Sequence, residues 1–169
     1  TALSAHALIE AGGEHAEAAD RGLAWLKPLQ VLDVKGDWAE RKPDVRPGGW
    51  AFQYRNDHYP DLDDTAVVAM AMDRARGQSG DPGFDESIAR AREWVVGLQS
   101  SNGGWAAFDA DNTATYLNYI PFADHGALLD PPTSDVTARV VSMVAQLGET
   151  PATSPAMKRG IDFLLAEQH

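Results

Sequence analysis

The strongest constraint on the fold of this chain is an internal repeat with a period of 69 residues. An aromatic residue followed five places later by a glutamine occurs three times in register: Trp25 and Gln30, Trp94 and Gln99, Phe163 and Gln168. Self-similarity at a fixed period is the signature of repeat architectures. Apolar residues before each glutamine recur at three- and four-residue spacing, which predicts an amphipathic helix that ends near the glutamine.

A second helix is predicted in each unit. Residues 65–72 and 136–144 form apolar runs, and Asp64 and Asp135 stand where an N-cap is expected. Residues 1–10 are interpreted as the remnant of an earlier copy, and the chain as a piece of a longer protein because it begins with threonine.

Helical hairpins that cannot bury their apolar faces alone must stack on neighbours. We therefore expect an all-α fold of α/α-hairpin repeats that forms an open arc of an (α/α) barrel or toroid. Residues 1–169 would be part of that barrel domain. Strand signals are weak apart from residues 50–54.

The glutamines are interpreted as structural ties between repeats. Gln99 is followed four residues later by glycine and then by Trp105, and Gln30 has a looser counterpart in Gly36 and Trp38. The glutamine amide can satisfy orphan carbonyls at a helix end, and glycine permits the turn that follows.

Two long segments, 28–60 and 106–134, lead into the second helices and are rich in Gly, Pro, Asp and aromatic residues. Long loops inside a compact domain are commonly functional. We expect both segments to gather at one end of the arc and to form a site there. Nine aromatic residues lie in or beside them: Trp50, Phe52, Tyr54, Tyr59, Trp105, Phe108, Tyr116, Tyr119 and Phe122.

The candidate catalytic residues are Asp61, Asp63 and Asp64, directly ahead of an apolar helix. Crowded carboxylates raise the pKa of at least one member, and a helix N-terminus stabilises the anion that remains after proton transfer. Such a group suits an acid that protonates an alkene, while aromatic faces stabilise the resulting cation.

Simpler interpretations of the acidic group are helix capping and a magnesium or calcium site. A calcium loop at residues 109–112 is rejected because the expected glycine and glutamate are missing, and the histidines lack metal-ligand spacing. A net charge of −11 argues against nucleic acid as a partner. Disulfide and thiolate chemistry are excluded because the chain has no cysteine.

Taken together, these motifs resemble those of squalene–hopene cyclases over almost the whole chain. The resemblance rests on residues 48–53, 59–66, 99–105, 109–112 and 130–138, which include the Asp-Leu-Asp-Asp run and the Gln-to-Trp elements. It implies a two-domain enzyme attached to the cytoplasmic face of the bacterial inner membrane. Squalene would be converted to hopene or hopanol without cofactor or metal, and a homodimer is allowed. The piece alone is expected to be inactive.

The resemblance also assigns roles to individual residues. Asp63 would donate the proton with support from Asp61 and Asp64, and Asp135 would belong to its hydrogen-bond network. Substrate contacts would come from four aromatic residues: Trp50, Phe52, Trp105 and Phe108.

This sequence departs from the family pattern at two of these positions. Arg139 replaces a histidine that pairs with the acid. Arginine cannot shuttle a proton but can stabilise a carboxylate, and the same charge opposes the protonated resting acid that the first step needs, so both effects stay open. Phe108 replaces a tyrosine, so no hydroxyl acts there.

Two other function classes remain open at this point. The first is a helical-repeat binding module whose acidic loops recognise a basic or metal-bearing partner. The second is a glycosidase on an α/α toroid, which would need a second carboxylate about 5 to 9 Å away across a cleft.

Overall fold

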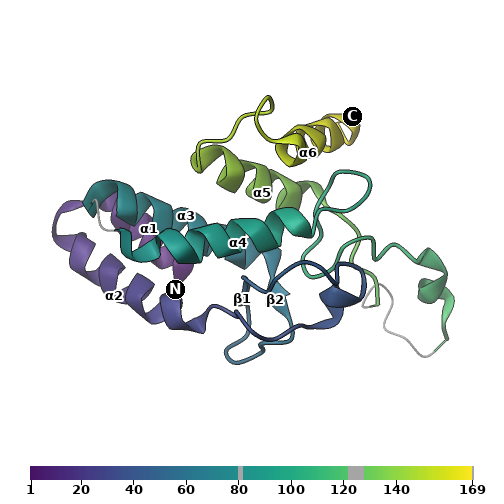
Figure 1. The fold of residues 1–169 in the computed structure, drawn as a ribbon, viewed down its shortest axis with the longest axis horizontal. Helices are drawn as coiled ribbons and strands as arrows, with labels where there is room; N and C mark the ends of the chain where they lie inside the picture. Colours follow the sequence, from purple (N-terminus) through teal and green to yellow (C-terminus); the bar gives the residue numbers. More distant parts are fainter. Residues whose placement is uncertain (80–81, 122–127, 169) are drawn as a thin grey trace.

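The structure is a computed structural model that describes residues 1–79, 82–121 and 128–168. The α-helices of this part form three successive hairpins (Figure 1). In chain order the helices are α1 (Ala2–Ala11) with α2 (Ala16–Leu26), α3 (Leu62–Ser79) with α4 (Asp85–Gly97), and α5 (Ser134–Gln146) with α6 (Pro155–Ala166). The expected all-α hairpin repeat is confirmed.

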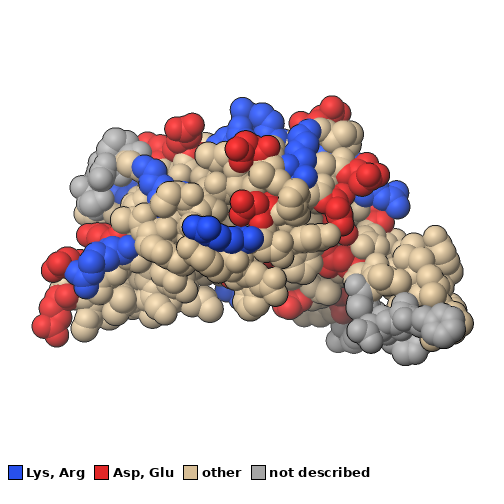
Figure 2. All heavy atoms as spheres, turned by 90° about the horizontal axis from the view of Figure 1, so that it is seen from below, with Lys and Arg blue, Asp and Glu red and all other residues tan. Residues whose placement is uncertain are grey.

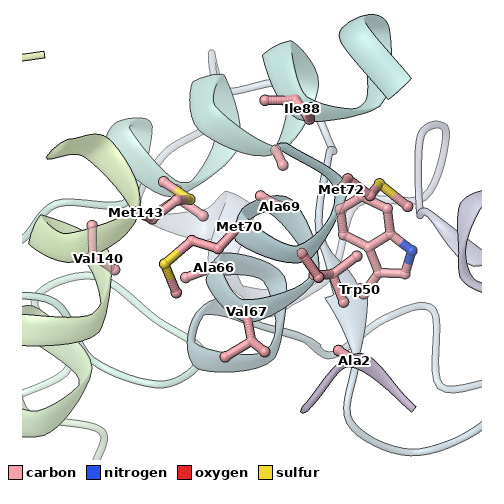
Figure 3. Close-up of a cluster of buried hydrophobic side chains, with 14 of the residues drawn as sticks. Ala2, Trp50, Ala66, Val67, Ala69, Met70, Met72, Ile88, Val140 and Met143 are labelled. Atoms are coloured by element: carbon pink, nitrogen blue, oxygen red, sulfur yellow. The ribbon is translucent and has the colours of Figure 1, made fainter. Parts of the chain in front are cut away.

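Helices α1, α3 and α5 form one layer, and α3 packs between the other two. Each of α2, α4 and α6 packs on the outside of its own hairpin partner (Figure 1). Because α3 is covered on several sides, residues 65–72 are buried throughout, and this explains their continuous apolar run. Figure 3 shows α3 side chains meeting Ile88 of α4 and Val140 and Met143 of α5.

Regular β-structure in the described residues is short. Strand β1 (Trp50–Ala51) pairs antiparallel with β2 (Pro60–Asp61), and Trp50 lies opposite Asp61. The strand expected at residues 50–54 is therefore two residues long. This short pairing matters for the site, because it holds the first long loop against Asp61, the residue immediately before α3.

Both predicted N-caps were wrong. Helix α3 begins at Leu62, and the Asp61 carboxylate accepts a hydrogen bond from the Asp64 backbone N–H at 2.8 Å, so Asp61 caps the helix. Helix α5 begins at Ser134 with Thr133 at the N-cap position, which puts Asp135 in the first turn. In α3 the earlier residue Asp61 supplies the side-chain cap, whereas Thr133 occupies the N-cap position of α5 without a side-chain cap hydrogen bond.

The glutamine ties between repeats are confirmed. The Gln30 side-chain amide donates to the Gly48 carbonyl at 2.8 Å and to the Ser87 carbonyl of α4 at 2.9 Å. In the next unit, the Gln99 amide donates to the carbonyls of Gly103 and of Ala156 in α6, both at 2.8 Å. Each glutamine thus bonds its own loop and the outer helix of the following hairpin.

The tryptophan that completes the first tie is Trp50, and the sequence-based pairing of Gln30 with Trp38 was wrong. Trp50 donates its backbone N–H to Thr65 Oγ1 and its indole Nε1–H to the Leu26 carbonyl, both at 2.8 Å. Trp105 repeats this arrangement, with Thr137 Oγ1 at 2.9 Å and the Val95 carbonyl at 2.8 Å. Gly-Gly-Trp at 48–50 is therefore the counterpart of Gly-Gly-Trp at 103–105.

The two long loops gather at one end of the arc, as expected (Figure 1). The Leu62 N–H donates to the Ala107 carbonyl of the second loop at 2.8 Å. Lys42 of the first loop donates to the Gln99 carbonyl at 2.9 Å. The N-terminus of α3 is consequently held between both loops.

The charged side chains are unevenly distributed over the surface. On the face shown in Figure 2, a broad area over the lower part of the molecule carries few charged side chains, and acidic and basic groups lie mainly over the upper half and at the left end. Among the described residues, no helix has the length and apolar character needed to cross a membrane.

Adding a methyl group at Gly160 should destabilise the protein. An ideal Cβ there would lie 2.6 Å from Trp105 Cζ3 and 2.9 Å from Val141 Cγ2, so the tie would have to shift. We expect Gly160→Ala to lower the free energy of unfolding by about 1–3 kcal/mol. In the matched control Gly77→Ala, in α3, no heavy atom lies within 4 Å, and a gain of about 0.5–1 kcal/mol is expected. Denaturant unfolding would measure both, and equal stability of the two variants would contradict this packing.

Candidate active site

Asp61 is the most buried member of the acidic group. Its side chain lies at the β2–α3 junction and accepts the N–H of Asp64, which fixes its orientation. Burial raises the pKa of Asp61 from 3.8 to about 6 against the opposing effect of this hydrogen bond, and the charges of Asp64 and Asp63 raise it further. Asp61 is therefore a rigid carboxyl group that holds a proton more firmly than a solvated aspartate.

Asp63 forms an ion pair that links two helices of the inner layer. Arg139 Nε of α5 lies 3.1 Å from Asp63 Oδ1 of α3, and the two side chains are 39% and 41% exposed. The helix packing thus brings together two residues that are far apart in the sequence. A cationic guanidinium at this distance stabilises the ionised carboxylate.

Asp64 is half-buried, and unlike Asp61 and Asp63 it lies at the edge of a cleft. Partial burial raises the pKa of Asp64, and the neighbouring charge of Asp63 adds to this effect. Asp64 lines a cleft of about 530 Å³, which Asp61 and Asp63 do not line. The three carboxyl groups of one short motif therefore occupy three distinct settings.

The cleft lies where the end of α2, β1 and the start of α3 meet. Its lining combines apolar and aromatic residues (Trp25, Leu26, Trp50, Phe52, Tyr54 and Val68) with polar and charged ones, among them Asp33, Arg55 and Asp57. Phe52 is 75% exposed, whereas Trp50 is buried and hydrogen-bonded. The exposed ring of Phe52 and the partly buried carboxyl group of Asp64 therefore line the same cleft.

The interactions of Asp135 lie at its own end of α5. A hydrogen bond from the Thr133 hydroxyl lowers the pKa of Asp135, and the Val136 N–H has the same effect. Asp135 is exposed, and Arg139 follows one turn later on the same helix. Its predicted place in the hydrogen-bond network of the acid remains a prediction.

The second loop places Trp105 and Phe108 differently. Trp105 is fully buried in the tie, and Phe108 remains 38% exposed. Asp130 was missed by the sequence reasoning as a functional residue: its carboxylate accepts the backbone N–H groups of Ala107, Phe108 and Asp109 at 3.1, 2.6 and 2.7 Å. It therefore shapes the loop that carries Phe108. The only sequence signal for it was the Asp-Pro-Pro run at 130–132.

Other predicted features of the site are only partly described. Tyr59 donates its hydroxyl to Asp37 at 2.9 Å, and Tyr116 and Tyr119 are strongly exposed. Phe122 lies outside the described residues. Within the described part of the chain, no group of three or more His, Cys, Asp or Glu side chains is arranged to hold a metal ion.

Comparison with known proteins decides the family. The model of the squalene-hopene cyclase C-terminal domain matches residues 1–169. The chain belongs to the squalene–hopene cyclase family.

Relatives with high identity cover the whole chain. It is 67% identical to the squalene–hopene cyclase of Zymomonas mobilis over 99% of its length, and 64% identical to that of Bradyrhizobium diazoefficiens over 100%. The Alicyclobacillus acidocaldarius squalene–hopene cyclase is 41% identical over 99% of the chain. The chain spans 26% of the length of each of these relatives. Family membership favours the cyclase interpretation over the binding module and the glycosidase.

The raised pKa of Asp61 predicts a pH-dependent effect of Asp61→Asn. Between about pH 4 and pH 6 the folded state retains a proton that the unfolded state has lost, so Asp61 makes the wild type less stable as the pH rises. Asparagine cannot ionise, and its carbonyl oxygen can still accept the Asp64 N–H. The Tm difference, variant minus wild type, should therefore increase from pH 4 to pH 7. Thermal melts across this range would measure it, and a constant difference would contradict the assignment.

Proposed function

We propose that the full-length protein containing this chain cyclises squalene to hopene or hopanol, with Asp63 as the acid that starts the reaction. The observation that carries this proposal is the acidic group at the start of α3, in a chain that is 64–67% identical to proteins named squalene–hopene cyclase. No cofactor is required, because proton transfer to an alkene and ring closure consume no redox equivalent.

The first step is a proton transfer. The Asp63 carboxyl proton adds to the less substituted carbon of the terminal alkene, the π-electron pair forms the new C–H bond, and a tertiary carbocation results at the other carbon. Asp63 is left as a carboxylate beside Arg139, which lies 3.1 Å away and stabilises that anion. Arg139 thus favours the product side of the transfer without itself exchanging a proton.

Asp61 and Asp64 support this step from fixed positions. Asp61 caps α3 through the Asp64 N–H, which orients the helix turn that carries Asp63. Both neighbours hold their protons more firmly than solvated aspartates because they are partly or fully buried. Because their pKa values are raised, Asp61 and Asp64 are ionised less of the time at a given pH, which reduces the repulsion that they impose on the new Asp63 anion.

Aromatic side chains stabilise the cations that follow. Phe52 and Phe108 are two of the exposed rings of the two loops, and each lies within three residues of a buried tie tryptophan. We assign Phe52 and Phe108 to direct cation stabilisation through their ring faces. Trp50 and Trp105, which the sequence assigned to substrate, would act mainly by holding these loops in place.

The parent enzyme is proposed to have two domains, with residues 1–169 as part of its (α/α) barrel. It would attach peripherally to the cytoplasmic face of the bacterial inner membrane. A membrane-bound position suits the substrate, since squalene is a hydrocarbon that partitions into lipid. The piece alone should be inactive because one arc cannot enclose a carbocation and exclude water.

Asp63→Asn in the full-length enzyme should lower kcat for squalene by about 100- to 10,000-fold, the usual contribution of a general acid. Asparagine has similar size, so folding should be retained. Asp20→Asn, at an exposed position of α2, is the matched control and should leave turnover unchanged. Product analysis by mass spectrometry measures both, and near-normal turnover by Asp63→Asn would refute the assignment.

Replacing Arg139 should separate the effect of its charge from its shape. Arg139→Gln removes the cation that stabilises the Asp63 carboxylate, and we expect kcat to fall at least about tenfold. Arg139→Lys keeps the charge and should retain more activity than the glutamine variant. Steady-state kinetics with squalene would distinguish them, and equal loss in both variants would show that charge is not the contribution of Arg139.

A further inference from the structure

Polar side chains join α3 to α5 at two levels of the inner layer. Near the start of both helices, Arg139 Nε lies 3.1 Å from Asp63 Oδ1. Toward the other end, the Gln146 side-chain amide donates to the Met70 carbonyl at 2.9 Å. In each pair the α5 residue stands 76 positions after its α3 partner, so both contacts belong to one register of the two helices. The two levels lie about two helical turns apart, or roughly 10 Å along the helix axes.

Gln146 places its whole side-chain amide on α3. Besides the Met70 carbonyl, its Nε2 donates to Asp73 Oδ2 at 2.8 Å. Its Oε1 accepts a hydrogen bond from Arg74 Nε at 3.1 Å. Since these partners are neighbouring positions of α3, one side chain fixes both the height and the rotation of α5 against that helix.

The two charged partners on α3 are themselves held by further ion pairs. Arg74 also pairs with Glu10 of α1, so the network reaches across the inner layer. Asp73 also pairs with Arg76, which donates to Asp85 Oδ1 of α4 at 2.9 Å. Both charged groups therefore keep a partner if the glutamine amide is removed.

Between the two levels the contacts are apolar. Figure 3 shows Met70 of α3 directed toward Val140 and Met143 of α5, and all three residues are buried. Apolar contact is non-directional, and methionine adapts its shape to a new neighbour. Polar groups at a helix interface, in contrast, can specify register. The polar contacts therefore specify the position of α5 along α3.

The contact of Arg139 with Asp63 is the weaker of the two levels. Both of these side chains are about two-fifths exposed, so water competes for the pair and it contributes little to holding the helices. Gln146 is half-buried, and two of its three contacts are to charged groups, which make the stronger hydrogen bonds. The geometry of the ion pair thus follows the register that the glutamine sets.

We propose that Gln146 is a positioning residue for the initiating acid. By fixing the register of α5 on α3, it holds the Arg139 guanidinium beside Asp63. This inference rests on the proposed function, in which Arg139 stabilises the carboxylate that proton transfer leaves on Asp63. Gln146 acts through Arg139 and exchanges no proton itself.

A double-mutant cycle in the full-length enzyme tests this role. Gln146→Met keeps the length of the side chain and removes the amide. With squalene as substrate, we expect kcat to fall about three- to tenfold with KM unchanged, because the stabilising contact of Arg139 is lost. In an Arg139→Gln background the same change should lower kcat by less than about 1.5-fold. An unchanged kcat in the first case, or an equal fall in both backgrounds, would overturn the inference.

Gln78→Met is the matched control. Gln78 also lies on α3, but its amide donates to the Ile9 carbonyl of α1 at 3.5 Å. Its loss should leave kcat unchanged, because it does not join α3 to α5. A fall as large as that of Gln146→Met would reveal a general response to a lost contact between helices, and would count against a specific role for Gln146.

Failure of the proposed function would be recognised separately. If Asp63→Asn and Arg139→Gln retain normal turnover, the assignment of the acid fails whatever the glutamine does. If both lose turnover and the cycle is additive, only the role of Gln146 fails.

A crystal structure of the full-length Gln146→Met variant measures the register without reference to the reaction. Arg139 Nε and Asp63 Oδ1 should lie more than about 4 Å apart, beyond the range of an ion pair. An unchanged contact of 3.1 Å would overturn the inference. Gln146→Asn, whose amide is one methylene shorter and cannot keep both the Met70 and the Asp73 contact, serves for the same measurements if the methionine variant does not fold.

Discussion

The structure depends on buried glutamine amides that bond from one helical hairpin to the next. A buried amide is costly unless its donors are satisfied. Gln30 and Gln99 each place both N–H donors on carbonyl groups, one in the local loop and one in the following hairpin. Because the second acceptor belongs to another unit, the bond fixes the spacing between hairpins. Arg159 also donates to the Gln99 side-chain oxygen, which satisfies the remaining acceptor of that amide.

The acidic motif takes its position from these ties. Trp50 bonds to Leu26 of α2 and to Thr65 in the first turns of α3, so the helix start is fixed relative to the preceding hairpin. On the other side, Leu62 bonds to Ala107 of the second loop, directly after the second tie. As a result, Asp61 is a buried helix cap, Asp63 forms an ion pair with Arg139, and Asp64 lines the cleft. Different surroundings for neighbouring carboxyl groups are the usual means by which one of them becomes an acid.

Much of this arrangement could be predicted from the sequence because it repeats. The 69-residue period identified the outer helices, and the in-register glutamines identified the ties. The partner of Gln30 was misassigned because 18 residues separate it from Gly48, against four between Gln99 and Gly103, so sequence proximity favoured the wrong tryptophan. Hydrogen bonding across the loop, which sequence spacing does not encode, selects Trp50.

The site was less predictable than the fold. Residues 61–64 offer three aspartates that can each cap a helix, and only the backbone geometry selects Asp61. The importance of Arg139 followed from a family resemblance, but its 3.1 Å contact with Asp63 depends on how α3 and α5 pack. Asp130 was overlooked because a carboxylate that binds three backbone N–H groups leaves no pattern in its own neighbourhood.

The central functional claim is that an exchangeable carboxyl proton initiates the reaction, and turnover in deuterium oxide tests it most directly. Full-length enzyme equilibrated in deuterium oxide and given unlabelled squalene should release a cyclised product that carries one solvent deuterium on a methylene carbon of the first ring, the carbon that was the less substituted end of the protonated alkene. A cyclised product without deuterium at that carbon would show that ring formation begins by another route, and would contradict the assignment of the acidic group.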